Sequence, residues 1–148
     1  MSEKERYGTR DLTYSDWHRT HSTKRFLGAR QAFRLGAIDI DDCEYDRETN
    51  EPLALIEVAR DVGQSYKPAH VMARLAQRAG LPAWVALFAR EPCALMAVPC
   101  VMCGGSGQVQ KFDISGFRVA PAHRQEWQHM DPAVYARWLL SMREDSNG

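Results

Sequence analysis

The stretch AIDIDDCEYDRETNEPLALIEVAR, residues 37–60, decides the fold of this chain. Its first part alternates polar with apolar residues, which is typical of a half-buried β-strand. The residues RETNE before Pro52 favour a turn, and Leu53–Val58 is a continuous apolar run, as in a strand covered on both faces. The sequence therefore predicts an antiparallel hairpin whose second strand ends at a single carboxylate, Glu57.

That carboxylate needs a partner, because an acidic side chain in a buried strand is unfavourable unless it is neutralised. Side chains alternate across a strand, so Asp39 and Asp41 share one face of the first strand. A divalent cation held between Asp41 and Glu57, with Asp39 as a supporting ligand, would supply the missing positive charge. This pattern favours a metal-dependent hydrolase that acts on phosphate esters.

The remaining acidic residues of the strand, Asp42, Glu44 and Asp46, have a simpler interpretation as a solvated surface. The chain has 19 basic and 19 acidic residues and no net charge, which argues against coating nucleic acid by bulk electrostatics. The charges are segregated, however. Residues 39–51 hold seven acids, whereas residues 1–34 hold eight Lys/Arg and residues 60–90 hold five. An acidic centre between basic segments suits a metal site that receives a phosphate backbone, although ordinary clustering of surface charge explains it equally well.

At 148 residues, the chain has the length of one ordinary domain. Residues 1–14 are expected to be a flexible segment, residues 15–143 a single domain and residues 144–148 a frayed tail. The predicted elements are a helix from Ser15 to about Lys24, extended residues 31–46 containing the first strand, the strand 53–58, a helix from Pro68 to Ala79 that Gly80 ends, strands over 83–89 and 111–119, and a helix from Pro132 to about Arg143. We expect an α/β fold, with a central mixed sheet flanked by helices.

Two helices have clear apolar stripes. The inner stripe of the helix 68–79 is predicted to consist of Val71, Met72, Leu75, Ala76 and Ala79. The inner stripe of the last helix is predicted to consist of Val134, Tyr135, Trp138, Leu139 and Met142. The N-terminus lacks the apolar segment of a signal peptide, and no run reaches the length of a membrane span. We therefore expect a cytoplasmic protein with no membrane contact and with reduced cysteines.

The cysteines offer a second, weaker hypothesis. Cys100 and Cys103 have the spacing of a metal-binding turn, and Cys93 with His123 would complete a zinc site of three cysteines and one histidine. The alternative is that Cys93 and Cys100 pack as small apolar residues. A structural Zn²⁺ ion would make the chain a zinc-stabilised interaction protein.

An aspartate on one strand, a hairpin, and an apolar strand ending in Glu-x-Lys form the signature of the PD-(D/E)xK nuclease superfamily. Over about residues 15–90, with the phrases DIDDCEY and PLALIE, the chain resembles small phage-type members of that superfamily. The resemblance implies a restriction-endonuclease-like core in which Asp41 and Glu57 bind Mg²⁺ or Mn²⁺ and activate a water for attack on a phosphodiester. It also favours DNA over RNA as the substrate, without excluding RNA, and it implies the cytoplasm of a bacterium or of a phage-infected host, with a homodimer as one workable assembly.

The sequence departs from the motif at one position. Ala59 stands where the motif has its lysine, which would orient the water and offset developing charge. We interpret Lys67, at the start of the following helix, as the substitute, because its long side chain could reach back over the strand ends; Gln64 is a second polar candidate. The alternative is a catalytically inactive relative that binds DNA or a protein partner.

Basic residues supply the predicted contacts to DNA phosphates. His18 and Arg19 lie on the first predicted helix, and Arg74 and Arg78 lie on the helix 68–79. Arginine suits this role because its planar guanidinium group can donate two parallel hydrogen bonds to a phosphate. The alternative is that these residues form ordinary polar helix faces.

Overall fold

The computed structural model describes residue 13 and residues 22–32, 34–99 and 106–146. It divides the chain into two units, Met1–Asp39 and Ile40–Gly148. Across the described residues, no helix is both long enough and apolar enough to cross a membrane.

Among the described residues of the N-terminal unit, Ser22–Ala32 form helix α2. It is kinked at Gly28, whose φ of 75° lies outside the helical region. The prediction that Gln31 begins an extended segment is wrong, since Gln31 and Ala32 still belong to the helix. Alanine, arginine and glutamine favour helix, and residues 29–32 consist of them alone, so local propensity outweighs the alternating pattern that follows.

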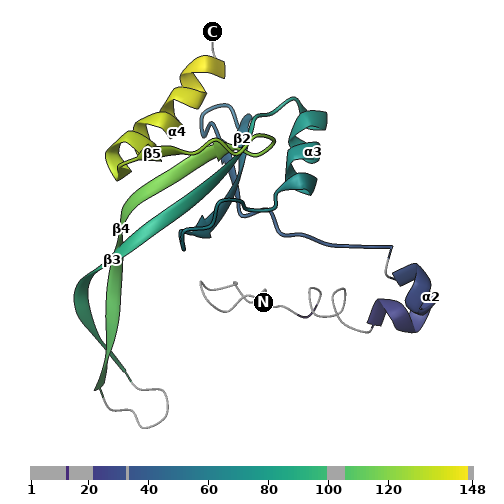
Figure 1. The fold of residues 1–148 in the computed structure, drawn as a ribbon, viewed down its shortest axis with the longest axis horizontal. Helices are drawn as coiled ribbons and strands as arrows, with labels where there is room; N and C mark the ends of the chain where they lie inside the picture. The colour runs from purple at the N-terminus through teal and green to yellow at the C-terminus, as the bar shows by residue number, and fades with distance from the viewer. Residues whose placement is uncertain (1–12, 14–21, 33, 100–105, 147–148) are drawn as a thin grey trace. The chain divides into compact units, whose positions relative to one another are not determined.

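The second unit is built on a five-stranded mixed sheet with the strand order β1-β2-β3-β4-β5 (Figure 1). Strand β2 is antiparallel to β1 and parallel to β3, and the pairs β3–β4 and β4–β5 are antiparallel. The predicted α/β fold with a central mixed sheet is therefore confirmed. The elements in chain order are β1 (Asp42–Tyr45), β2 (Pro52–Arg60), α3 (His70–Ala79), β3 (Ala83–Pro99), β4 (Ser106–Pro121), β5 (Gln128–Met130) and α4 (Pro132–Ser146).

The β1–β2 hairpin forms as the sequence predicts, and its turn is organised by Asp46. The carboxylate of Asp46 accepts hydrogen bonds from the backbone N–H groups of Glu48 and Thr49, at 2.8 and 3.4 Å. It also accepts one from Arg143 Nε of α4 at 2.8 Å, which lowers the pKa of this carboxyl. Asp46 is only 4% exposed, so its interpretation as a solvated residue is wrong. The turn needs its carboxylate, and arginine neutralises it.

Helix α3 connects the parallel strands β2 and β3 and covers one face of the sheet. Gly80 ends it in the left-handed conformation, with φ at 70°, as the sequence predicts. The buried face of the helix contains Met72 and Ala76. Val71 and Leu75 are 60% and 45% exposed and Ala79 is exposed too, so the assignment of these three residues to the inner stripe is wrong. The helix therefore covers the sheet through a narrow strip of its surface, in which Met72 and Ala76 are the fully buried residues.

Helix α4 covers the opposite face (Figure 1). Residues of β2 alternate between the two faces: Leu55 packs in the α3 cluster, and Ala54 and Ile56 pack in the α4 cluster. The predicted inner residues Tyr135, Trp138, Leu139 and Met142 all contact this second cluster. Val134 is an exception and is 38% exposed.

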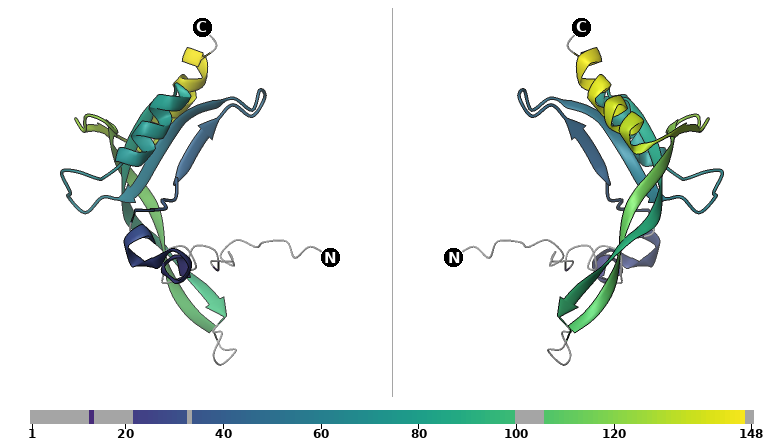
Figure 2. Two further views of the ribbon diagram at one scale, coloured as in Figure 1. Left: turned by 90° about the vertical axis from the view of Figure 1, so that its right-hand side faces the viewer. Right: turned by 90° about the vertical axis from the view of Figure 1, so that its left-hand side faces the viewer.

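Strands β3 and β4 are longer than the sequence predicts and run together well past the other strands (Figure 2). Pro92 lies within β3 near a register shift between Pro92 and Ala94, and a second shift follows Ala89. Proline is tolerated at such irregularities. The short strand β5, which the sequence does not predict, extends the sheet on the far side of β4.

Candidate active site

Asp41 and Glu57 lie next to each other at one end of the β1–β2 hairpin. Asp42 pairs with Ile56, so one further step along the two chains brings Asp41 opposite Glu57. The carboxylate of Asp41 accepts a hydrogen bond from the backbone N–H of Val58, with 3.0 Å between Oδ2 and N. The hairpin register therefore brings the backbone of Asp41 beside that of Glu57, and one carboxylate oxygen of Asp41 accepts the N–H of the residue that follows Glu57.

Lys67 completes this arrangement. Its Nζ lies 3.0 Å from Glu57 Oε1, and the two side chains are 32% and 17% exposed. Glu57 lies on the α3 face of β2, on the same side as Ala59, where the motif lysine would stand. Lys67 reaches this face from the loop before α3, so a cation stands beside the second carboxylate, although the strand itself does not supply it.

Residues distant in sequence hold Lys67 in place. The side-chain amide of Gln125 accepts a hydrogen bond from the backbone N–H of Lys67 at 2.9 Å and donates one to its carbonyl oxygen at 2.6 Å. The indole N–H of Trp127 donates to the carbonyl oxygen of Ser65 at 2.9 Å. These contacts fix the backbone on which the catalytic candidate depends. The sequence does not predict the roles of Gln125 and Trp127, because no local pattern links them to residues about 60 positions earlier.

Arg118 fixes the other end of the loop between β2 and α3. The guanidinium group of Arg118 donates two hydrogen bonds to the carboxylate of Asp61, at 2.7 and 2.6 Å, and a third to the carbonyl oxygen of Gln64. It also lies over the Trp127 ring, 5.1 Å from its centroid. The side chain of Gln64 bonds within its own loop, to Arg60 and Val62, so it is not directed at the carboxylates.

The Asp61–Arg118 pair predicts an acid-sensitive contribution to stability. The hydrogen bonds from Arg118 lower the pKa of Asp61 to about 2. A carboxyl with a lowered pKa stabilises the fold above its ordinary pKa of about 3.9, and this contribution is lost as the pH falls toward 2. We expect Asp61→Asn to lower the free energy of unfolding by about 1–2 kcal/mol at pH 7.

Urea unfolding followed by circular dichroism, from pH 7 to pH 2, measures this effect. The difference between wild type and Asp61→Asn should shrink below about pH 4, whereas Glu91→Gln, which changes an exposed carboxylate of β3, should unfold like the wild type at every pH. A difference that stays constant down to pH 2 would contradict an ionic role for Asp61.

The other acidic residues of β1 belong to the opposite face of the sheet. Asp42 and Glu44 are half-buried near α4. Burial, followed by the negative charges of Glu44 and Asp42, raises the pKa of Tyr135 to about 12. Burial and the neighbouring Asp42 also raise the pKa of Glu44. These carboxylates therefore face α4 rather than Asp41 and Glu57.

The remaining predicted residues are dispersed. Asp39 is the last residue of the N-terminal unit, and its role as a supporting ligand stays a prediction. Arg74 and Arg78 are both exposed on α3, and Arg74 lines a groove beside that helix. His18 and Arg19 lie outside the described residues.

Only two of the four residues of the predicted zinc site are described by the structure. Cys100 and Cys103 lie outside the described residues, Cys93 is an exposed free thiol on β3, and His123 is exposed after β4. In the part of the chain that the structure describes, no group of three or more His, Cys, Asp or Glu residues is arranged to hold a metal ion.

Asp41 and Glu57 nevertheless fit a hydrated divalent cation. Mg²⁺ is usually bound by one or two carboxylates, and its remaining ligands are waters and substrate phosphate oxygens. Two carboxylates and one lysine leave a net charge of about −1, which a divalent cation would offset. The donors are carboxylate oxygens, which suit Mg²⁺ or Mn²⁺ better than metals that prefer sulfur.

Comparison with known proteins gives no family for this chain. No family model matches it, and neither a curated protein nor a solved structure shows significant similarity to it.

Proposed function

We propose that this chain is a metal-dependent nuclease that hydrolyses DNA phosphodiester bonds, with Asp41, Glu57 and Lys67 as its catalytic residues. The observation that carries the proposal is the position of Lys67 Nζ, 3.0 Å from Glu57 Oε1. On the same hairpin as Glu57, the carboxylate of Asp41 accepts a hydrogen bond from the backbone N–H of Val58. These are an aspartate, a glutamate and a lysine in the order of the PD-(D/E)xK motif, except that a loop supplies the lysine.

The proposed roles of the three residues follow from their charges. Asp41 and Glu57 would hold Mg²⁺ or Mn²⁺, which when bound lowers the pKa of a coordinated water and offsets charge on the phosphate. Gln125 fixes the backbone of Lys67 through two hydrogen bonds, and the ion pair with Glu57 holds the ammonium group beside the carboxylate before a substrate arrives. There it donates hydrogen bonds to the attacking water or to a non-bridging phosphate oxygen, where negative charge increases during the reaction.

Asp41→Asn is the sharpest test of the metal site. Asparagine keeps an oxygen that can accept the hydrogen bond from Val58, so the hairpin should keep its register while the charge is lost. Because a bound metal contributes several kcal/mol to transition-state stabilisation, we expect cleavage to fall about 100-fold or more. Binding of Mn²⁺, measured by calorimetric titration, should weaken in parallel.

The assay uses a panel of linear, supercoiled, single-stranded and branched DNAs and an RNA of matched sequence. Each is incubated with Mg²⁺, with Mn²⁺ or with EDTA, and wild type and Asp41→Asn are prepared identically. Cleavage that needs the metal and is lost in the variant supports the proposal. Metal binding at millimolar concentration without cleavage of any substrate would favour the alternative, an inactive binding protein on a nuclease-like scaffold.

A further inference from the structure

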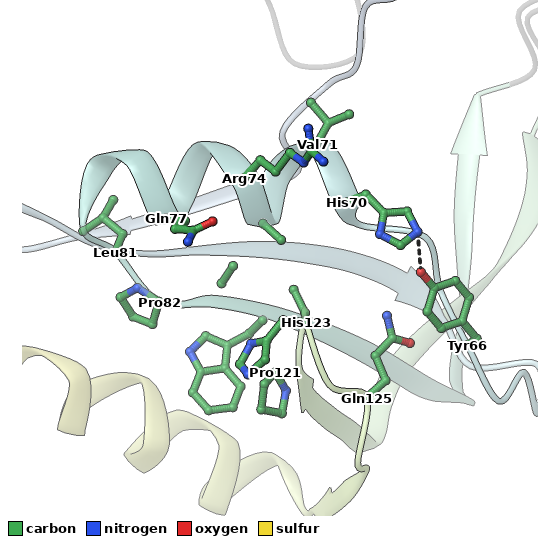
Figure 3. Close-up of a pocket in the computed structure, with 14 residues that line it drawn as sticks. Tyr66, His70, Val71, Arg74, Gln77, Leu81, Pro82, Pro121, His123 and Gln125 are labelled. Atoms are coloured by element: carbon green, nitrogen blue, oxygen red, sulfur yellow. Dashed lines mark hydrogen bonds between the residues drawn. The ribbon is translucent and has the colours of Figure 1, made fainter.

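A groove beside α3 has no role in the catalytic proposal. It lies between that helix and the turn that follows β4, within the second unit, and its volume is about 1010 Å³. Figure 3 shows Leu81 and Pro82 at one end and Tyr66 and Gln125 at the other, with Arg74 and Gln77 above. Pockets for small ligands usually have volumes of about 300–1,000 Å³, so this groove has room for more than one nucleotide.

The charge of the groove points to an anionic occupant. Arg74, His70 and His123 line it, and none of the 14 residues that line it is an aspartate or a glutamate. In a chain with equal numbers of acidic and basic residues, this is a local separation of charge. A surface that attracts anions and carries no repelling carboxylate is complementary to phosphate.

The floor and walls of the groove suit the faces of bases. Leu81, Pro82, Trp84 and Pro121 contribute apolar surface, and the side-chain amide of Gln77 provides donors and an acceptor for base edges. Proteins that bind single strands combine a positive groove with apolar and aromatic surfaces on which bases stack. A duplex keeps its base faces stacked inside the helix and would leave this apolar surface unused.

The groove is also continuous with the segment that carries the catalytic lysine. Tyr66 directly precedes Lys67. Gln125 lines the groove, and its side chain also hydrogen-bonds the backbone N–H and the carbonyl oxygen of Lys67. The hydroxyl of Tyr66 and Nε2 of His70 are 2.8 Å apart, so this end of the groove is ordered by its own contacts. A strand seated along α3 would therefore lead toward Lys67.

We propose that this groove binds an unpaired segment of a DNA strand, with phosphates at Arg74 and the two histidines and with bases against the apolar floor. The proposal rests on the proposed nuclease function and specifies its substrate as DNA with a single-stranded end or gap. Binding at the groove needs neither metal nor cleavage.

Fluorescence anisotropy in EDTA tests this directly, with a fluorescein-labelled 10-nucleotide single strand and a hairpin duplex of the same sequence. We expect the single strand to bind about tenfold more tightly than the duplex, since one stacked base contributes about 1–3 kcal/mol. Arg74→Gln should weaken single-strand binding and lower the slope of log Kd against log salt by about 0.7, the value of one phosphate contact. Gln77→Glu should weaken it as well, because it places a negative charge in the groove.

The matched control is Arg137→Gln, an exposed arginine on α4 at the other face of the sheet, and it should leave affinity and salt dependence unchanged. Equal affinity for the two DNAs, or equal effects of Arg74→Gln and Arg137→Gln, would overturn the groove proposal even if the protein cleaves DNA. Conversely, selective single-strand binding without any cleavage would support the groove and overturn only the nuclease function.

Discussion

Glu57→Gln is expected to abolish DNA cleavage while leaving the fold intact. Glutamine keeps the volume of the side chain and its ability to hydrogen-bond, but it removes the charge that would hold the metal. Losing this carboxylate at the centre of the site should lower the rate about 1,000-fold or more, since each 1.36 kcal/mol of lost transition-state stabilisation costs a factor of ten.

The fold should tolerate this change. Lys67, the ion-pair partner of Glu57, is 32% exposed, so its ammonium group can be solvated when the carboxylate is removed. Ion pairs of this exposure contribute about 0–1 kcal/mol, and the free energy of unfolding should change by no more than that. The measurements are initial cleavage rates with Mg²⁺ and urea unfolding of both proteins. Wild-type activity in Glu57→Gln would remove this residue from the catalytic site.

Lys67→Ala should also lower the cleavage rate about 100-fold or more, because it removes a hydrogen-bond donor from the negative charge that develops on the phosphate. The two hydrogen bonds from Gln125 are made to the backbone of residue 67, so the loop should keep its position in the variant. Mn²⁺ binding, measured by calorimetry, should remain, because both carboxylates are still present.

A relocated lysine provides the matched control for this experiment. Ala59 lies on the same face of β2 as Glu57, at the position where the PD-(D/E)xK motif has its lysine. The double variant Lys67→Ala with Ala59→Lys should recover a measurable part of the lost activity. Rates in Lys67→Ala equal to the wild type would show that this cation is an ordinary surface lysine, whatever the double variant does.

The local parts of the candidate site could be predicted from the sequence. The turn before Pro52 and the apolar run after it set the hairpin, and the hairpin register brings Asp41 to Glu57. The approach of Lys67 could also be anticipated, because it lies in the connection between β2 and α3 and its long side chain can reach back over the end of the strand. Its catalytic role stays a prediction.

The contacts that fix this geometry were beyond sequence reasoning. Gln125 and Arg118 meet Lys67 and Asp61 only because β3 and β4 return the chain to the same loop. The hydrophobic periodicity of the sequence likewise predicts the wrong inner face for α3. Val71 and Leu75 fit the helical repeat, but the sheet is covered through Met72 and Ala76, and only the packing partner decides which strip of the helix is buried.

The two hydrogen bonds between Gln125 and the backbone of Lys67 also determine when this loop can become ordered during synthesis. Lys67 leaves the ribosome 58 residues before its partner, a delay of about 3–12 s at a rate of 5–20 residues per second. During this interval the nascent chain carries Asp41, Glu57 and Lys67, but the contacts that fix the lysine do not yet exist. The backbone of Lys67 is therefore fixed only after the chain has been synthesised through Gln125.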